Sequence, residues 1–474
     1  MAYKTIVGLE IHVELSTKTK AFCSCENAYG GEPNTRVCPV CLGLPGALPV
    51  LSEEVVEAAA MASLALNCEV GQELTFDRKN YFYPDLTKGY QITQNDNHIG
   101  REGFIEVESD GVKKKIGIAQ IQIEEDTGKS LHTEEETLMD YNRCGVPLIE
   151  IVTKPDISSG LEARLFLEKL RATLKQIGVS DVKMEEGSLR CDVNVNIKDL
   201  DSQKRSSIQE VKNLNSFRGV EKAIDYEVAR QKALMEAGEE EIRTTRRWDD
   251  VANETVVMRA KLTGSDYRFV PEPDLAPIEL SPERIEEIRQ TMPELPDEKK
   301  ARFMEAYGLS AYDAEVLTQK ADLADFYEGV ARDFKDYGML ANWVTTEVLR
   351  RADFTEDEEL RLPFEEKDFS DLLKMIQEDK INNNAGKKVL RIMFEKGDKP
   401  EKIIEEEGLA QMQDSSLMES LVKEVLEENP ESVEDYRQGK DRVVGFLVGQ
   451  VMKKSRGKAN PQVVNQLLLE ALKK

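Results

Sequence analysis

The chain has 474 residues and a formal net charge of −26, from 64 basic and 90 acidic side chains. This length exceeds the usual size of one hydrophobic core and favours two to four domains. The acidic balance has the wrong sign for binding nucleic acid through the protein's general field, so any RNA contact would need local basic patches. Two runs are candidates, although such runs are commonly solvated surface: Lys113–Lys115, and Lys453, Lys454, Arg456 and Lys458.

Composition also bounds the compartment. Hydrophobic residues make up 40% of the chain, which is enough for packed cores. No uncharged apolar run approaches the ~20 residues of a membrane helix, and the N-terminus lacks the apolar region and cleavage site of a secretory signal. Seven cysteines, four of them clustered, suit reduced thiols or a metal site better than a disulfide framework. We therefore expect a cytoplasmic protein that binds no membrane.

The hydrophobic pattern changes along the chain from short strands to helices. Residues 1 to about 290 alternate strand-like runs with Gly, Pro and Asn, and contain helical patterns at 53–66 and 161–177. After a proline-rich stretch, almost every later segment has helical spacing and high Glu and Lys content. This pattern predicts an α+β domain at 1–292, a helical domain at 293–407 and a small helical tail at 408–474.

The first predicted strand places polar groups on one face. Successive side chains of a strand point to opposite faces, so residues two apart share a surface. In Gly8–Leu15 the odd-numbered residues are apolar, which leaves Glu10, His12 and Glu14 together on the other face. Two carboxylates and an imidazole are thereby aligned.

The residues 23–41 hold a cysteine cluster. Cys23-Ser-Cys25 and Cys38-Pro-Val-Cys41 have the ligand count and close spacing of a structural Zn²⁺ knuckle. A closed four-cysteine site leaves no position for water, so its role would be to brace the loop after the first strand. The alternative is four reduced thiols without metal.

Several acids stand at or inside later apolar strands. They are Glu124, Glu125, Asp126, Glu150 and Glu210. Each acid alone is better explained as the wet face of a half-exposed antiparallel sheet. Taken together, a concave sheet that gathers Glu125, Glu150 and Glu210 with Glu10 and His12 would hold Mg²⁺ through hard oxygen ligands.

Basic side chains occupy two of the predicted strands. Arg190 and Asp192 alternate with apolar residues in Leu189–Ile197, and Arg259 and Lys261 share a face of 255–262. Such cations would neutralise phosphate beside the metal, and this is the equipment of phosphoryl transfer.

The sequence holds no complete phosphate-binding loop. Gly128-Lys129-Ser130 resembles half of one, but Ile123 stands where the motif requires Gly. ATP would therefore bind on the sheet, through the metal and basic side chains. The candidates are Lys79, Lys88, Arg247 and Lys261.

Long motifs of one known family run through the chain. They are Gly8–Leu15, Cys38–Gly46, Arg78–Asp85, Ile123–Ser130, Asp140–Arg143, Pro147–Val152, Glu210–Phe217, Asp266–Arg268 and Pro271–Asp274, with Gly457–Pro461 in the tail. On these motifs the chain resembles the B subunit of the bacterial aspartyl/glutamyl-tRNA(Asn/Gln) amidotransferase. Motifs this long and numerous are far more specific than a short glycine pattern.

The resemblance implies a fold and a reaction. The fold is an antiparallel-sheet cradle of the glutamine synthetase/guanido kinase type, followed by a helical domain and a tail that grips tRNA. In the reaction, ATP and Mg²⁺ phosphorylate the side-chain carboxylate of Glu-tRNA(Gln) or Asp-tRNA(Asn), and ammonia displaces the phosphate. Activation is needed because a free carboxylate resists attack by ammonia. The family is thus an ATP-dependent carbon–nitrogen ligase with glutamine as amido donor.

The resemblance also implies partners in a heterotrimer. Nothing in the sequence resembles a glutaminase, so ammonia would come from a partner amidase, the A subunit, and a small C subunit would join the two. A misacylated tRNA is the implied substrate, and no DNA is involved. Both Glu-tRNA(Gln) and Asp-tRNA(Asn) are retained as substrates, because the choice depends on which synthetases the cell holds.

The family's site residues can be carried over onto this sequence. His12, Glu125 and Glu150 are implied as Mg²⁺ ligands. The predicted catalytic set is Glu10, Glu125, Glu210 and Lys261. The predicted ATP-binding set is Lys79, Lys88, Arg190, Arg259 and Lys261, of which Arg190, Arg259 and Lys261 are chosen on charge and strand face alone. The chain departs from the family's usual pattern at Lys261-Leu262 and Tyr267–Pro271.

Two other functions fit the same residues. One is a non-catalytic tRNA-binding scaffold whose acidic strands are only wet faces. The other is a metal-dependent hydrolase that uses His12 and the carboxylates on Zn²⁺.

Overall fold

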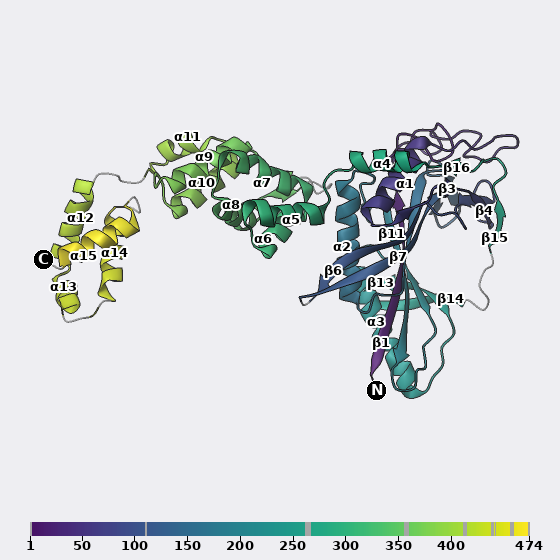
Figure 1. The fold of residues 1–474 in the computed structure, drawn as a ribbon. Helices are drawn as coiled ribbons and strands as arrows, with labels where there is room; N and C mark the ends of the chain where they lie inside the picture. The colour runs from purple at the N-terminus through teal and green to yellow at the C-terminus, as the bar shows by residue number, and fades with distance from the viewer. Residues whose placement is uncertain are drawn as a thin grey trace. The chain divides into compact units, whose positions relative to one another are not determined.

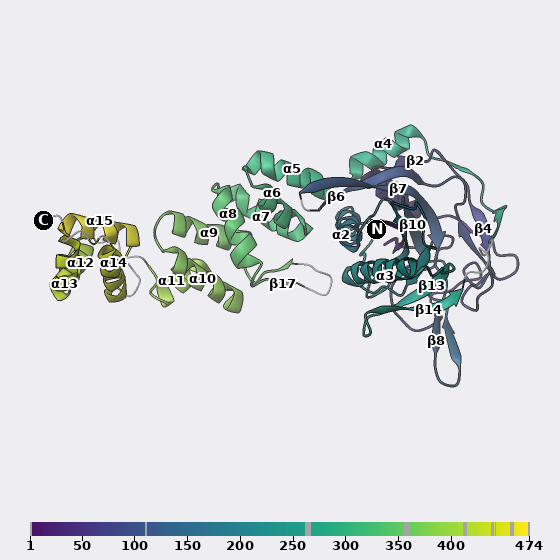
Figure 2. The same ribbon diagram turned by 90° about the horizontal axis from the view of Figure 1, so that it is seen from below.

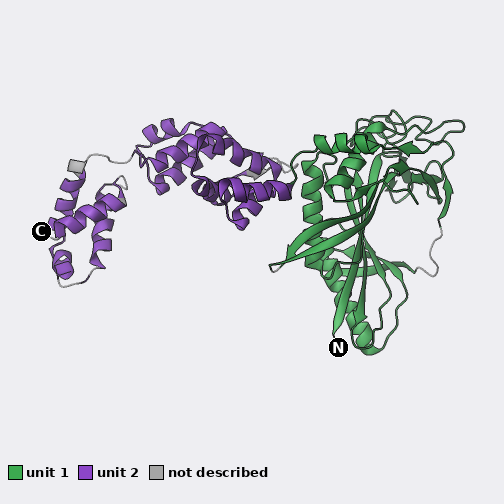
Figure 3. Ribbon diagram, viewed as in Figure 1, with its two compact units in different colours: residues 1–295 green, residues 296–474 purple. Residues whose placement is uncertain are grey.

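The computed structural model describes residues 2–109, 111–260, 267–354, 360–410, 415–437, 440, 442–455 and 459–472. The chain divides into two compact units, Met1–Leu295 and Pro296–Lys474 (Figure 3). Lys261, predicted as a catalytic and ATP-binding residue, lies outside the described residues, as do Arg456 and Lys458 of the tail run.

The first unit is built on a nine-stranded sheet (Figure 1). All neighbouring strands of this sheet are antiparallel except β12 and β13, which run parallel. In sheet order the strands are β14 (Glu254–Ala260), β13 (Thr244–Asp249), β12 (Gln209–Lys212), β11 (Leu189–Asp199), β1 (Tyr3–Glu14), β10 (Pro147–Thr153), β7 (Val112–Glu125), β6 (Gly100–Ser109) and β2 (Glu69–Val70).

Helices pack against one face of this sheet, and Figure 2 shows α2 (Gly160–Gln176) and α3 (Phe217–Ala237) side by side. Each begins after a serine, Ser159 or Ser216, whose hydroxyl accepts a hydrogen bond from a backbone N–H of the first turn. Gly238 ends α3 with a φ of 74°, a left-handed cap that glycine adopts without strain. The helices α1 (Glu53–Ala65) and α4 (Pro282–Thr291) join the same hydrophobic core.

The alternation predicted for the first strand is confirmed in β1. Leu9, Ile11 and Val13 are at most 1% exposed and belong to the core under the helices. Glu10 and His12 therefore project from the opposite face, where both side chains are half-buried.

Three small sheets complete the first unit. One is β15-β4-β5 (Arg268–Pro271, Asp77–Asn80, Tyr90–Thr93), and its strand β5 packs against β7. The others are β16-β3 (Ile278–Glu279, Glu73–Leu74) and the hairpin β8-β9 (Lys129–His132, Thr137–Asp140).

The second unit is helical apart from the short pair β17 (Asp353–Phe354) and β18 (Leu360–Arg361) within its described part. It contains two separate hydrophobic clusters. The first is formed by α5 (Pro296–Tyr307), α6 (Ala311–Thr318), α7 (Ala321–Asp333), α8 (Tyr337–Trp343), the π-helix η1 (Val344–Val348), α9 (Glu366–Gln377), α10 (Asn383–Lys396) and α11 (Pro400–Glu406). The second is formed by α12 (Ser415–Glu428), α13 (Pro430–Arg437), α14 (Val443–Lys454) and α15 (Pro461–Leu472).

These features confirm the coarse prediction of a mixed α/β part with a largely antiparallel sheet, followed by a helical part. Among the described residues, no helix combines the length and the apolar character needed to span a bilayer.

Candidate metal and phosphate site

A first group of metal-ligating side chains lies on the open face of the sheet. His12 in β1 stands directly opposite Glu150 in β10, and β7 supplies Glu124. Potential ligand atoms of the three residues all lie within 4.8 Å of one another. The His12 Nε2 atom is 3.7 Å from Glu150 Oε2 and 4.0 Å from Glu124 Oε2. Three adjacent strands thus bring two carboxylates and an imidazole to one point.

Hydrogen bonds fix the fully buried Glu124. Its carboxylate accepts from Thr93 Oγ1 at 2.6 Å, Gln91 Nε2 at 3.1 Å and Gln122 Nε2 at 3.0 Å. The same Gln122 amide donates to Glu150 Oε2 at 2.9 Å. These donors orient both acids before any ligand arrives, as the outer shell of a metal site does.

The electrostatics of this group favour a bound cation. Burial, followed by the charge of Glu124, raises the pKa of Glu150 to about 8. Burial lowers the pKa of His12, so the imidazole is held neutral and keeps a lone pair for a metal. Burial opposes ionisation of Glu124, but the charge of Lys79 and the hydrogen bonds from Thr93 and Gln122 lower the pKa of its carboxyl group. Glu124 and Glu150 lie close together with too little positive charge beside them, so their carboxylates repel each other. A divalent ion bound between them would relieve this repulsion.

Glu125, predicted as a metal ligand and catalytic residue, does not belong to this group. Its side chain pairs with Lys88 Nζ and accepts from the backbone N–H of Ile92 at 3.0 Å. Since strand side chains alternate, only Glu124 shares the face of Gln122. The signal was in the sequence, because Glu125 is in phase with the apolar Ile121 and Ile123.

A second group lies one step along β1. Glu10, Asp192 and Glu210 bring carboxylate oxygens within 4.8 Å of one another. Glu10 and Asp192 are register partners between β1 and β11, and β12 supplies Glu210. Asp192 was recognised on the polar face of its strand but was not predicted as a site residue.

Three side chains hold the second group in place. Asn194 Nδ2 donates to Glu10 Oε1 at 2.9 Å, and Thr245 Oγ1 donates to Glu210 Oε2 at 2.8 Å. Lys212, which the sequence reasoning missed, forms an ion pair with Asp192 and lies 3.4 Å from Glu210.

The predicted cations differ in their relation to these groups. Lys79 Nζ is 3.9 Å from Glu124 Oε1 and lies over the ring of Tyr267. Arg190 neighbours His12 in register and donates to Asp126 at 2.6 Å, while its buried Nε has no hydrogen-bond partner among the described residues. Lys88 forms an ion pair with Glu125. Lys79 and Arg190 are therefore the cations that border the first group.

Two other predicted cations lie near the edge of the sheet. Arg259 is exposed on the edge strand β14, opposite Thr245. Arg247 on β13 lies 3.4 Å from Asp249. Both residues lie on strands β14 and β13, which follow β12, the strand of Glu210, in the sheet.

The four predicted cysteines do come together. Their sulfur atoms lie within 4.8 Å of one another, and Cys38 and Cys41 Sγ are 3.9 Å apart. Tetrahedral Zn²⁺ with Zn–S bonds of about 2.3 Å requires sulfurs about 3.8 Å apart, so the donor set and spacing fit this ion. The cluster can hold a metal such as zinc.

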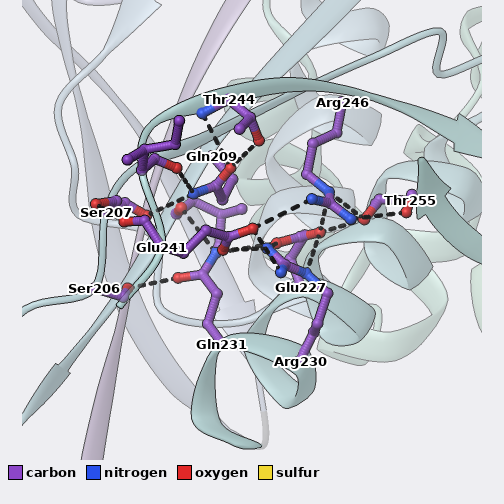
Figure 4. Close-up of polar contacts among 12 residues, drawn as sticks. Ser206, Ser207, Gln209, Glu227, Arg230, Gln231, Glu241, Thr244, Arg246 and Thr255 are labelled. Carbon is purple, nitrogen blue, oxygen red and sulfur yellow. Dashed lines mark hydrogen bonds and ion pairs between the residues drawn. The ribbon is translucent and has the colours of Figure 1, made fainter. Parts of the chain in front are cut away.

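A buried network braces the strands behind Glu210 (Figure 4). Glu227 of α3 accepts from Arg230 Nη2 at 2.7 Å and lies 3.0 Å from Arg246 Nε of β13. Arg230 also binds Glu241 through two bonds of 2.8 Å, and Arg246 donates to Thr255 of β14 at 2.8 Å. The network joins β13 and the edge strand β14 to α3, on the sheet face opposite the carboxylates of Glu10, Asp192 and Glu210.

Comparison with known proteins identifies the family of the chain. Residues 5–286 match a family model described as the GatB/GatE catalytic domain, and residues 325–472 match one described as a GatB domain. The chain is 49% identical to the B subunit of the aspartyl/glutamyl-tRNA(Asn/Gln) amidotransferase of Carboxydothermus hydrogenoformans, over 100% of this chain and 99% of that protein. It is 50% identical to the proteins of the same name from Clostridium tetani and Finegoldia magna, over 100% of both chains in each case. The resemblance predicted from the sequence motifs is thus confirmed: the chain belongs to the family of the B subunits of aspartyl/glutamyl-tRNA(Asn/Gln) amidotransferases.

Proposed function

We propose that this chain is the subunit of a tRNA-dependent amidotransferase that phosphorylates the side-chain carboxylate of Glu-tRNA(Gln), Asp-tRNA(Asn) or both. Ammonia then displaces the phosphate, and Gln-tRNA(Gln) or Asn-tRNA(Asn) is formed. The proposal depends mainly on two clusters of potential metal ligands, His12 with Glu124 and Glu150, and Glu10 with Asp192 and Glu210. Each cluster includes one residue of β1, and lysine and arginine side chains border the first cluster. The fold of the first unit is proposed to be a cradle of the glutamine synthetase/guanido kinase type.

The two groups have separate roles in this proposal. His12, Glu124 and Glu150 would hold one Mg²⁺, and Glu10, Asp192 and Glu210 would hold another. When bound, Mg²⁺ and ATP supply an electrophilic terminal phosphoryl group whose charge the metal neutralises.

The cations at the border would act on the phosphates. The Lys79 ammonium is held near Glu124 and aimed by the face of Tyr267, and Arg190 is oriented by Asp126. Both would bind phosphate oxygens and orient the nucleotide, while Arg259 and Lys261 would serve the outer wall. Positioning and charge stabilisation of this kind account for most catalysis in phosphoryl transfer.

Other parts of the molecule would serve assembly. We propose domains at 1–292, 293–407 and 408–474, with the tail holding tRNA and the cysteine cluster holding a structural zinc. Lys454 of the tail is paired with Glu424 and Glu428, so RNA phosphates would have to displace these acids. An amidase, the A subunit, would deliver ammonia, and a small C subunit would join the two, in the cytoplasm.

A matched pair of variants tests the proposal. ATP cleavage should be measured in the purified complex with Glu-tRNA(Gln), comparing Glu124→Gln with Glu125→Gln. We expect Glu124→Gln to lower turnover on the order of 100-fold or more, equivalent to about 2.7 kcal/mol, and Glu125→Gln to have a clearly smaller effect. If both variants were as active as the unmodified complex, the scaffold alternative would be favoured. Hydrolysis of a substrate in the absence of ATP would favour the metal-dependent hydrolase.

A further inference from the structure

Lys20 is an unusual residue beside the cysteine cluster, because its side chain is completely buried. It follows β1, and its backbone N–H donates to the carbonyl of Cys25 at 3.0 Å. Its Nζ donates to the carbonyl of Arg36 at 2.8 Å and lies 3.8 Å from Cys41 Sγ. No ion pair within 4.0 Å joins this ammonium to a carboxylate among the residues that the structure describes.

A buried ammonium of this kind needs a compensating anion. Lysine is almost never fully buried unless it is paired, and desolvating an unpaired charge costs several kcal/mol. The carbonyl of Arg36 offers a dipole but no charge. The sulfur of Cys41 is the neighbouring atom that becomes anionic when it binds a metal.

The metal centre has the complementary deficit. Four thiolates around one Zn²⁺ carry an excess of about two negative charges, and the sulfur of Cys41 is almost inaccessible to solvent, because that residue is 4% exposed. A cation inside the fold would offset part of this excess. The buried lysine and the four-thiolate centre therefore each supply the charge that the other lacks.

We propose that Lys20 is the internal counter-ion of the four-cysteine metal centre and raises its affinity for Zn²⁺. The proposal rests on metal binding by the four cysteines and is independent of the ATP chemistry. Lys20 acts through the ligand Cys41 and is a positioning and charge-balancing residue, not itself a ligand.

The centre is linked to the wall of the carboxylate site. Thr87 Oγ1 donates to the carbonyl of Cys41 at 2.8 Å, and the next residue, Lys88, pairs with Glu125. The backbone N–H of Ala21 donates to the carbonyl of Gly145 at 2.8 Å, and the N–H of Gly145 donates to the carbonyl of Asp126, which follows β7, at 3.0 Å. These contacts join the cysteine cluster to the segment that holds Lys88.

The test measures zinc affinity of the full chain by competition with a chromophoric chelator. The variants are Lys20→Met, which removes the charge, and Lys20→Gln, which keeps a donor for the Arg36 carbonyl. Lys18→Met is the matched control, because Lys18 is exposed and its loss changes net charge equally. We expect both Lys20 variants to bind Zn²⁺ about 10- to 100-fold more weakly, the usual effect of losing an outer-shell partner, and Lys18→Met to bind as the unmodified chain does.

Thermal unfolding with and without zinc separates this role from a purely structural one. Removal of an uncompensated buried charge should leave the metal-free Lys20→Met protein as stable as the unmodified chain, or more stable, while the zinc-loaded variant unfolds at a lower temperature. Equal destabilisation of both forms would overturn the proposal, as would unchanged zinc affinity or an equal loss in Lys18→Met. Failure of the unmodified chain to bind zinc would overturn the metal site together with the role of Lys20, whereas the ATP assay would be unaffected.

Discussion

The two faces of the central sheet both carry clustered charges, but they balance them differently. Between the sheet and α3, the acids Glu227 and Glu241 meet the cations Arg230 and Arg246, one for one. On the open face, five carboxylates in two groups have Lys79 and Lys212 as their paired lysines among the described residues. Charges are matched where they hold strands together and left in excess where we propose that a cation binds.

The largest effect should come from the balanced cluster. Glu227→Gln removes the buried carboxylate that Arg230 and Arg246 share and leaves Glu241 to face both cations, and breaking a buried pair typically costs about 3–5 kcal/mol. We expect a loss of this size in the free energy of unfolding by urea. Glu240→Gln is the control, since its exposed pair with Lys204 should contribute less than about 1 kcal/mol. Similar small losses in both variants would show that the network is not a brace.

The excess of carboxylates on the open face should make the stability of the chain depend on pH. The pKa of Glu150 is raised from 4.5 to about 8, so between these pH values the folded chain keeps a proton that the unfolded chain releases. Stability of the metal-free protein should therefore fall as pH rises from about 5 to 8, and Mg²⁺ should restore it at pH 8.

Glu150→Gln isolates this contribution. Glu14, whose pKa burial raises to about 7, adds a slope of the same sign and is unchanged in the variant. The melting temperature of Glu150→Gln should consequently depend less on pH and should rise less with Mg²⁺, because only the group of Glu10, Asp192 and Glu210 remains intact. An unaltered pH slope in Glu150→Gln would contradict the charge excess assigned to this face.

The smallest effect should separate two adjacent threonines. Thr245 donates to Glu210 on the open face, whereas Thr244 donates to Gln209 on the helix face. Thr245→Val should raise the Mg²⁺ concentration for half-maximal ATP turnover about 10-fold, as loss of an outer-shell partner does. Thr244→Val should instead lower stability and leave the Mg²⁺ requirement unchanged. A Mg²⁺ shift in Thr244→Val of the same size would mean that the faces are not independent.

Much of this arrangement was predictable from local sequence pattern. The alternation in Gly8–Leu15 gave the correct face for Glu10 and His12, and the helical patterns at 53–66 and 161–177 match α1 and α2 within one residue. These features depend on the two-residue and 3.6-residue periods, which neighbouring residues alone determine.

The rest depended on contacts between distant segments. Three acids in a row follow Ile123, so phase alone had to choose between Glu124 and Glu125, and the resemblance favoured Glu125, whose side chain pairs with Lys88 instead. Asp192 joins Glu10 and Glu210 only through the order of the strands, which no local pattern specifies. The burial of Lys20 likewise follows from a loop that folds back on the cysteines.

The single strand β1 gives one residue to each of the two proposed Mg²⁺ groups, so the spacing of these two residues fixes both groups at once. Glu10 and His12 are two positions apart, one full pleat or about 6.6 Å along the strand. Inserting or deleting one residue between them would turn one of these side chains into the hydrocarbon interior. Point substitutions here would damage one ion site at a time, whereas a one-residue frame slip would remove a ligand and expose apolar surface together.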